Sequence, residues 1–144
     1  MHLIKLNLEH GSVYVDSSPI EVDENGVLRD AIKNLCSPPI NISQEHTRYK
    51  LLRKVRIFEQ LADGIIEIKN RKKLSVTFLF DLVEFFESSI LESKIIKACE
   101  KSLNLKFASN HPSTAFLGFC EWGSAVFFYD AKQGDLSLEI KIEH

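Results

Sequence analysis

The apolar residues of this chain change their spacing, from alternation at both ends to a helical period in the middle. Residues 103–142 contain four segments in which every second residue is apolar, the pattern of a half-buried β-strand. The links between them, NHPS, Trp122-Gly123 and AKQGD, contain turn-forming residues and are too short for crossover helices. This third of the chain therefore predicts an antiparallel β-meander.

The N-terminal residues show the same alternation. The segments HLIKLNL and SVYVD alternate apolar and polar side chains, and EHG between them supplies a turn. Residues 2–16 therefore predict a β-hairpin.

The middle of the chain has apolar residues three and four positions apart, which is the spacing of an amphipathic helix. Residues 27–36 predict a short helix that ends before Pro38-Pro39. Residues 44–62 predict a longer helix, closed by Asp63-Gly64 through the preference for glycine after a helix. Five residues form its apolar stripe: Leu51, Leu52, Val55, Phe58 and Ala62.

Residues 76–87, with Ser75 as N-cap, predict a helix by the same spacing, and residues 88–104 predict a further helix or a bent continuation of it. Residues 65–69 predict a short strand. Strands at both ends and helices between them favour an α+β fold. We expect residues 1–144 to form a single globular domain: an N-terminal β-hairpin, and three to four central helices packed on the C-terminal antiparallel β-meander.

The composition is that of a folded globular protein, with 44% hydrophobic and 26% charged residues. We predict neither a membrane span nor a signal peptide, because the apolar runs are short and the N-terminal one lacks a basic flank. Cys36, Cys99 and Cys120 are odd in number and widely spaced, which favours reduced thiols in a cytoplasm over disulfides or a zinc site. We expect no cofactor, no bound metal and no catalytic residue.

The formal net charge of -2 conceals an uneven distribution. Residues 48–73 contain nine Lys or Arg and three acidic residues, a net charge of +6, and the remaining 9 basic and 17 acidic residues give -8. Such a molecule can steer an acidic partner to one side. The partner-binding residues that we predict combine the cations with two aromatic residues: Lys50, Arg53, Lys54, Arg56, Arg71, Lys72, Lys73, Trp122 and Tyr129.

We expect a small, non-enzymatic domain that binds another protein, of the inhibitor, immunity or adaptor type found in bacteria and phage. No known catalytic motif occurs in the sequence, and the charge asymmetry and surplus aromatic residues both suit an interface. An inhibitor of this kind could also imitate nucleic acid with its acidic side chains: Asp81, Glu84, Glu87, Glu121, Asp130 and Asp135.

The first alternative is a nucleic-acid-binding protein that uses the basic segment 48–73, with Arg53, Arg56, Lys72 and Lys73 neutralising phosphates. A pI near 6.2 and the lack of a nucleic-acid-binding motif count against this alternative. Basic residues on one face of a helix are also common where that face is simply solvated.

The second alternative is a metal-dependent nuclease. Asp130 precedes Glu139-Ile140-Lys141 on the next predicted strand, and Asp63 precedes Glu67-Ile68-Lys69. Two carboxylates can hold a divalent metal while a lysine helps to activate water. A plain strand explains the motif equally well, because alternation would send Ile140 to the core and its polar neighbours to water.

Overall fold

The computed structural model describes residues 1–7, 11–57, 60–80, 97, 100, 101, 108–111, 115–130 and 135–142, with backbone alone at residues 7, 108–111, 115–120, 129, 130, 135 and 136. Within these residues β-strands predominate, and no helix reaches seven residues. The predicted α+β fold with three to four central helices is therefore wrong, and the fold is mainly β.

The N-terminal residues form a hairpin, as predicted. Strand β1 (His2–Asn7) pairs antiparallel with β2 (Ser12–Val15), and β3 (Ser18–Pro19) continues the ladder. Val13 and Val15 are buried, whereas the residues between and beside them are more exposed. The alternation in the sequence thus corresponds to one inward and one outward face.

The segment 44–62, predicted as a helix, forms strands and their links as far as it is described. Before this segment come a four-residue helix α1 (Asp30–Lys33) and the exposed strand β4 (Ile40–Ser43). The strands β5 (His46–Lys50), β6 (Val55–Ile57) and β7 (Gln60–Lys69) follow. Leu51, Val55 and Ala62 are buried as predicted, but Leu52 is 68% exposed. Phe58 lies outside the described residues.

The next predicted helix, residues 76–87, is also extended as far as it is described. Strand β8 (Lys73–Phe80) buries alternate residues, among them Val76, Phe78 and Phe80. β-Branched and aromatic residues fit a half-buried sheet well, and here they outweigh the helical spacing. Residues 81–87 lie outside the described residues, and of the predicted helix 88–104 only Lys97, Glu100 and Lys101 are described, in helical conformation.

The C-terminal meander is confirmed. Strands β9 (Ala108–His111), β10 (Ala115–Cys120), β11 (Gly123–Asp130) and β12 (Asp135–Ile142) pair antiparallel in order. β12 then pairs with β8, and β8 pairs with β7. The order across the sheet is β3-β2-β1-β6-β7-β8-β12-β11-β10-β9, and β5 pairs with the second half of β7 and carries β4 on its other side.

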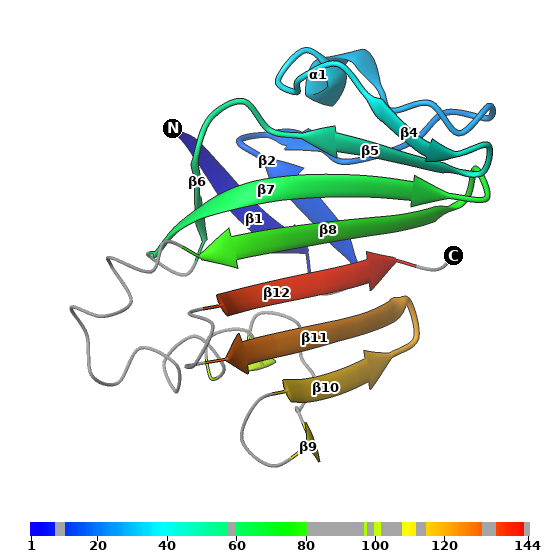
Figure 1. Cartoon of the computed structure of the whole chain (residues 1–144). Coiled ribbons are helices and arrows are strands. Elements are labelled where there is room, and N and C mark those ends of the chain that lie inside the picture. The colour runs from blue at the N-terminus through cyan, green and yellow to red at the C-terminus, as the bar shows by residue number, and fades with distance from the viewer. Residues whose placement is uncertain are drawn as a thin grey trace.

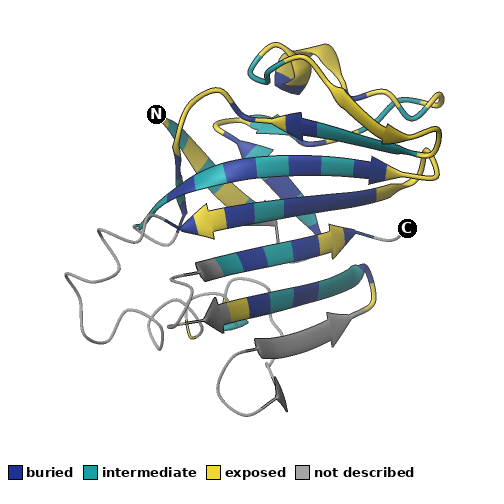
Figure 2. Cartoon of the chain, in the orientation of Figure 1, coloured by how far each residue is buried: buried dark blue, intermediate teal, exposed yellow. Residues whose placement is uncertain are grey.

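The core lies between the broad sheet and the N-terminal strands, which pass behind it (Figure 1). Ile66, Val76, Ile140 and Ala125 stand opposite one another on β7, β8, β12 and β11, and none of them is exposed to solvent. Figure 2 shows the resulting alternation of buried and less buried positions along the described strands. Inward residues therefore build one core, and the outward face of the same strands is free to carry polar side chains.

Among the described residues, no helical segment has the length and hydrophobicity needed to cross a lipid bilayer.

Candidate anion-binding surface

The turn between β7 and β8 concentrates positive charge at one end of the sheet. Lys69 and Lys73 stand directly opposite each other, and Asn70 and Arg71 between them have φ angles of 53° and 60°. Two successive positive φ angles are the mark of a type I′ turn, whose twist matches that of the two strands. The amide of Lys72 donates to the Lys69 carbonyl oxygen at 3.3 Å, which closes the turn.

Two neighbouring loops support this turn. The Asn70 amide donates to the Glu45 carbonyl oxygen at 2.8 Å. Gly26, with a φ of 76°, lies so close that a Cβ atom added to it would come within 2.7 Å of the Arg71 Cα atom. The Asp23 side chain holds that loop by accepting hydrogen bonds from the amides of Asn25 and Val27 at 2.8 and 2.9 Å. These contacts with two loops hold the backbone of the turn in place, and its cationic side chains extend from it.

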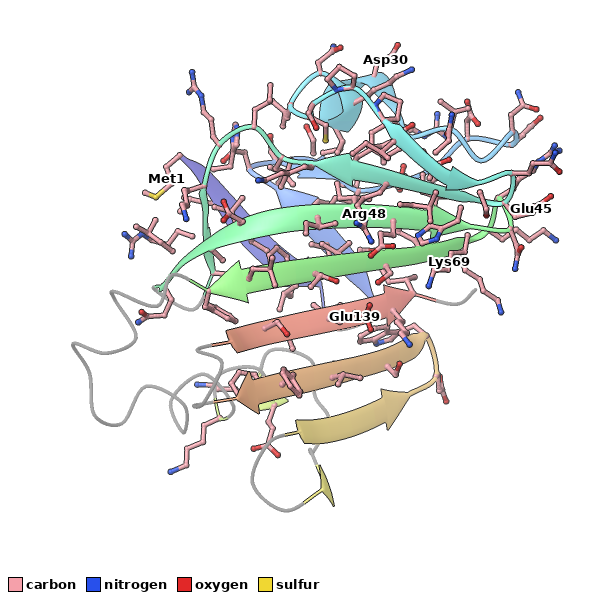
Figure 3. The ribbon with its side chains drawn as sticks, viewed as in Figure 1. Met1, Asp30, Glu45, Arg48, Lys69 and Glu139 are labelled. Carbon is pink, nitrogen blue, oxygen red and sulfur yellow. The ribbon has the colours of Figure 1, made fainter. Side chains whose placement is uncertain are left out.

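A cavity of about 190 Å³ opens on the outer face beside this turn. It is lined by Lys69 of β7, by Lys73, Leu74 and Ser75 of β8, and by Lys141 of β12. Ser75 stands opposite Lys141 across the β8–β12 pair. Figure 3 shows Lys69 on the same face of the sheet as Arg48 and Glu139.

The two carboxylates described on this part of the face are already engaged. Ser75 donates from Oγ to Glu139 Oε2 at 3.0 Å, and Lys141 Nζ lies 3.6 Å from Glu139 Oε1. Glu67 Oε2 pairs with His46 Nε2 and lies 3.7 Å from Arg48 Nη2. These two carboxylates are therefore partly neutralised by groups other than the lysines at the turn.

Four cations of the turn have no charged partner among the described residues. Lys69, Arg71, Lys72 and Lys73 are all exposed and form no ion pair with any residue that the structure describes. Together with Lys141 they define the basic hairpin tip: Lys69, Arg71, Lys72, Lys73 and Lys141.

The other predicted cations lie beside the middle and the first half of β7. Lys50 stands opposite Ile65, and Arg53 and Lys54 are in the link from β5 to β6, where Lys54 Nζ lies 3.4 Å from Asp63 Oδ2. Arg56 is on β6, opposite Leu61. At about 3.3 Å per residue, Lys50 therefore lies about 13 Å and Arg56 about 26 Å from Lys69 along β7, so the predicted cations are spread along the strand.

The two predicted aromatic residues do not form part of a described surface. Trp122 is only 8% exposed, and its ring packs so closely on Gly11 that a Cβ atom added there would lie 2.2 Å from the ring. The structure therefore places Trp122 in the core. The side chain of Tyr129 lies outside the described residues, as do Asp81, Glu84 and Glu87 of the acidic set.

The residues predicted for a nuclease site are not brought together. Asp130 stands opposite Asp135, whereas Glu139 stands opposite Val126, so the two positions are about 13 Å apart along the strand. Nowhere in the described residues do three or more His, Cys, Asp or Glu side chains gather in a way that could hold a metal ion.

A second cavity, of about 340 Å³, lies on the inner side of the same turn. Its apolar floor is formed by Ile20, Leu74 and Ile142, which are all buried. Lys72 and the Arg29–Glu21 ion pair, at 3.5 Å, stand at its edge. The basic hairpin tip thus borders a cavity on each side.

Lys69, Ser75 and Lys141 were not among the predicted partner-binding residues, although Lys69 and Lys141 are the lysines of the two tripeptides considered for a nuclease. Lys69 belongs to the same run of charge as the predicted residues Arg71, Lys72 and Lys73. In a hairpin centred on Arg71, Lys69 and Lys73 are equally far from the centre of the turn, and this could have indicated that they pair. Lys141 gives no such signal, because it is brought to the site by the pairing of β12 with β8, 66 residues earlier in the chain.

The thiol of Cys36 is protected, which leads to a testable prediction. Its Sγ atom donates to the Ile32 carbonyl oxygen at 3.4 Å, and burial raises the pKa of Cys36 to about 11. Because the thiolate is the nucleophile, we expect iodoacetamide at pH 8 to alkylate Cys36 roughly 100-fold more slowly than free cysteine. Mass spectrometry of a chain with Cys99 and Cys120 replaced by serine measures this rate, and reaction as fast as that of free cysteine would contradict the described burial.

Comparison with protein-family models, with curated proteins and with solved structures gives no match for this chain.

Proposed function

We propose that this chain is a non-enzymatic domain that binds an acidic partner protein through the basic hairpin tip. The supporting observation is the group of exposed cations at the tip that have no ion pair with any described residue. An interface of this kind attracts a negatively charged partner and orients it during the encounter.

The shape of the charged surface favours a protein over a nucleic acid. A nucleic acid needs a continuous basic path for its regularly spaced phosphates. Here carboxylates interrupt the cations along β7, because Glu67 pairs with Arg48 at 3.7 Å and Asp63 pairs with Lys54 at 3.4 Å. The tip is a compact basic patch, which suits a cluster of acidic side chains on a partner.

The pairing of the outer-face carboxylates supports a binding role over catalysis. Glu139 is engaged by Ser75 and Lys141, and Glu67 by His46 and Arg48. A general acid or base needs a carboxylate or imidazole that can reach a substrate. We further propose an inhibitor, immunity or adaptor protein of the cytoplasm, a compartment with which the free thiol of Cys36 agrees.

Charge reversal at the tip tests this function. In the variant Lys72→Glu/Lys73→Glu, we expect the affinity for acidic proteins of the source cell, and for polyglutamate as a defined probe, to fall by at least about tenfold, because like charges then face each other. The matched control is Lys50→Glu/Arg53→Glu, which makes the same change of charge at two exposed residues away from the tip. Biolayer interferometry at several salt concentrations measures both variants.

Two outcomes would contradict the proposed function. One is that the control variant weakens binding as much as the tip variant does. The loss of affinity would then follow from the net charge of the chain and not from the position of the tip. The other is that duplex DNA binds the original chain more tightly than polyglutamate does at equal salt, which would favour the nucleic-acid alternative.

A further inference from the structure

The lysines beside the outer cavity are arranged in a way that costs stability unless an anion lies between them. Lys69 and Lys73 stand directly opposite each other on β7 and β8, and like charges in directly opposite positions destabilise a β-ladder. Lys141 adds a third ammonium group from β12 to the same cavity. None of the described acidic residues pairs with Lys69 or Lys73.

We propose that the cavity between Lys69, Lys73 and Lys141 is a socket for one phosphate group, carried on a phosphorylated side chain of the partner. Only the source of the phosphate, a partner protein, rests on the proposed function. The phosphate site itself would exist without a protein partner. Lysine binds phosphate as a point charge, so three ammonium groups can surround the phosphate oxygens without a fixed fork geometry.

The charge of the cavity fits a phosphate monoester better than a carboxylate. Three lysines and the nearby Glu139 give a net charge of +2, and Glu67, which stands opposite Ser75, is balanced by Arg48 at 3.7 Å. A phosphate monoester carries about -1.5 to -2 at pH 7. A single carboxylate would leave one of these positive charges unbalanced.

The size of the cavity fits a group rather than a whole ligand. Its volume of about 190 Å³ is the space of roughly six liquid water molecules, enough for a phosphate group and a few waters. Cavities for complete small molecules usually begin at about 300 Å³. The rest of the ligand would therefore lie outside the cavity, on the surface of the partner.

Ser75 and Glu139 position one wall of the socket. Ser75 is buried, and its hydroxyl group donates to Glu139 Oε2, while Glu139 Oε1 holds Lys141 Nζ at 3.6 Å. Glu139 thus fixes the ammonium group of Lys141 at the cavity. Lys69 and Lys73 have no equivalent support among the described residues and supply the uncompensated charge.

Thermal unfolding in phosphate tests the socket directly. We expect inorganic phosphate at ten times its Kd to raise the Tm of the original chain by about 3 °C over sodium chloride of equal ionic strength. In Lys73→Ala this phosphate-dependent rise should be lost, and the Tm in chloride should be equal to or higher than that of the original chain because one repulsion is relieved. Lys72→Ala, which lies outside the cavity, should keep the rise.

Short peptides then identify the source of the phosphate. We expect a fluorescent Gly-Gly-phosphoserine-Gly-Gly peptide to bind the original chain at least tenfold more tightly than the same peptide with glutamate, and to lose this preference in Lys73→Ala. Equal phosphate-dependent rises in Lys73→Ala and the original chain would overturn the socket.

Equal binding of the phosphoserine and glutamate peptides would overturn its preference for phosphate. Binding of inorganic phosphate without binding of the phosphoserine peptide would overturn the partner as its source and assign the socket to the free ion. In all three cases the proposed function would still be judged separately, by the charge-reversal variants and polyglutamate.

Discussion

Replacing Phe78 with alanine is expected to lower the free energy of unfolding by about 3 to 5 kcal/mol. Phe78 is fully buried in β8, where it stands opposite Gly64 of β7 and Leu138 of β12. Glycine has no side chain, so it cannot fill the space that the ring would leave, and a cavity remains. Urea unfolding measures the loss, with the fluorescence of Trp122, the single tryptophan and a buried one, as the probe.

The matched control is Leu79→Ala, one residue further along the same strand. Leu79 is 42% exposed on the outer face, so its truncation should cost no more than about 1 kcal/mol. Equal losses for the two variants would contradict the assignment of inner and outer faces in β8.

The second large effect is expected for Gly123→Ala. Gly123 begins β11 with a φ of 155°, and a Cβ atom added to it would lie 1.9 Å from the carbonyl oxygen of Lys141. Because the clash is with backbone, the β11–β12 pair must move apart where Gly123 stands opposite Ile142. We expect a loss of about 3 kcal/mol or more in the free energy of unfolding, measured by urea unfolding.

This substitution also links the fold to the phosphate socket. Moving the backbone of Lys141 displaces one of the three lysines, so the phosphate-dependent rise in Tm should shrink together with the stability. Ser124→Ala, at the next residue, leaves the backbone at Lys141 free of a clash and should change stability by no more than about 0.5 kcal/mol. Normal stability of Gly123→Ala would contradict the described approach of β11 to β12.

The middle of the chain could not be assigned from its sequence because it carries two periods at once. Leu51, Leu52, Val55 and Phe58 match a helical stripe, while Tyr49 and Leu51, and then Val55 and Ile57, alternate as in strands. The burial of Leu51 and Val55 is common to both interpretations. The exposed Leu52 distinguishes them.

Gly64 shows how a local signal can have a different origin. Its position after Asp63 predicts the end of a helix, but Gly64 lies within β7 and is buried. A Cβ atom added to Gly64 would lie 2.5 Å from Leu51 Cδ1, and the Leu51 amide donates to the Gly64 carbonyl oxygen at 3.0 Å. Glycine is needed there because another segment of the chain occupies the space.

Sequence alone determined the N-terminal hairpin, the C-terminal meander and the basic character of residues 69–73, because alternation and turn residues act between neighbours in the chain. Only the tertiary structure decided that residues 46–57 and 60–80 form strands and their links, and that Lys141 lies at one cavity with Lys69 and Lys73. The physical reason is that a strand is stabilised by the strands beside it. β7 pairs with β6, and β8 pairs with β12, which is distant in the sequence.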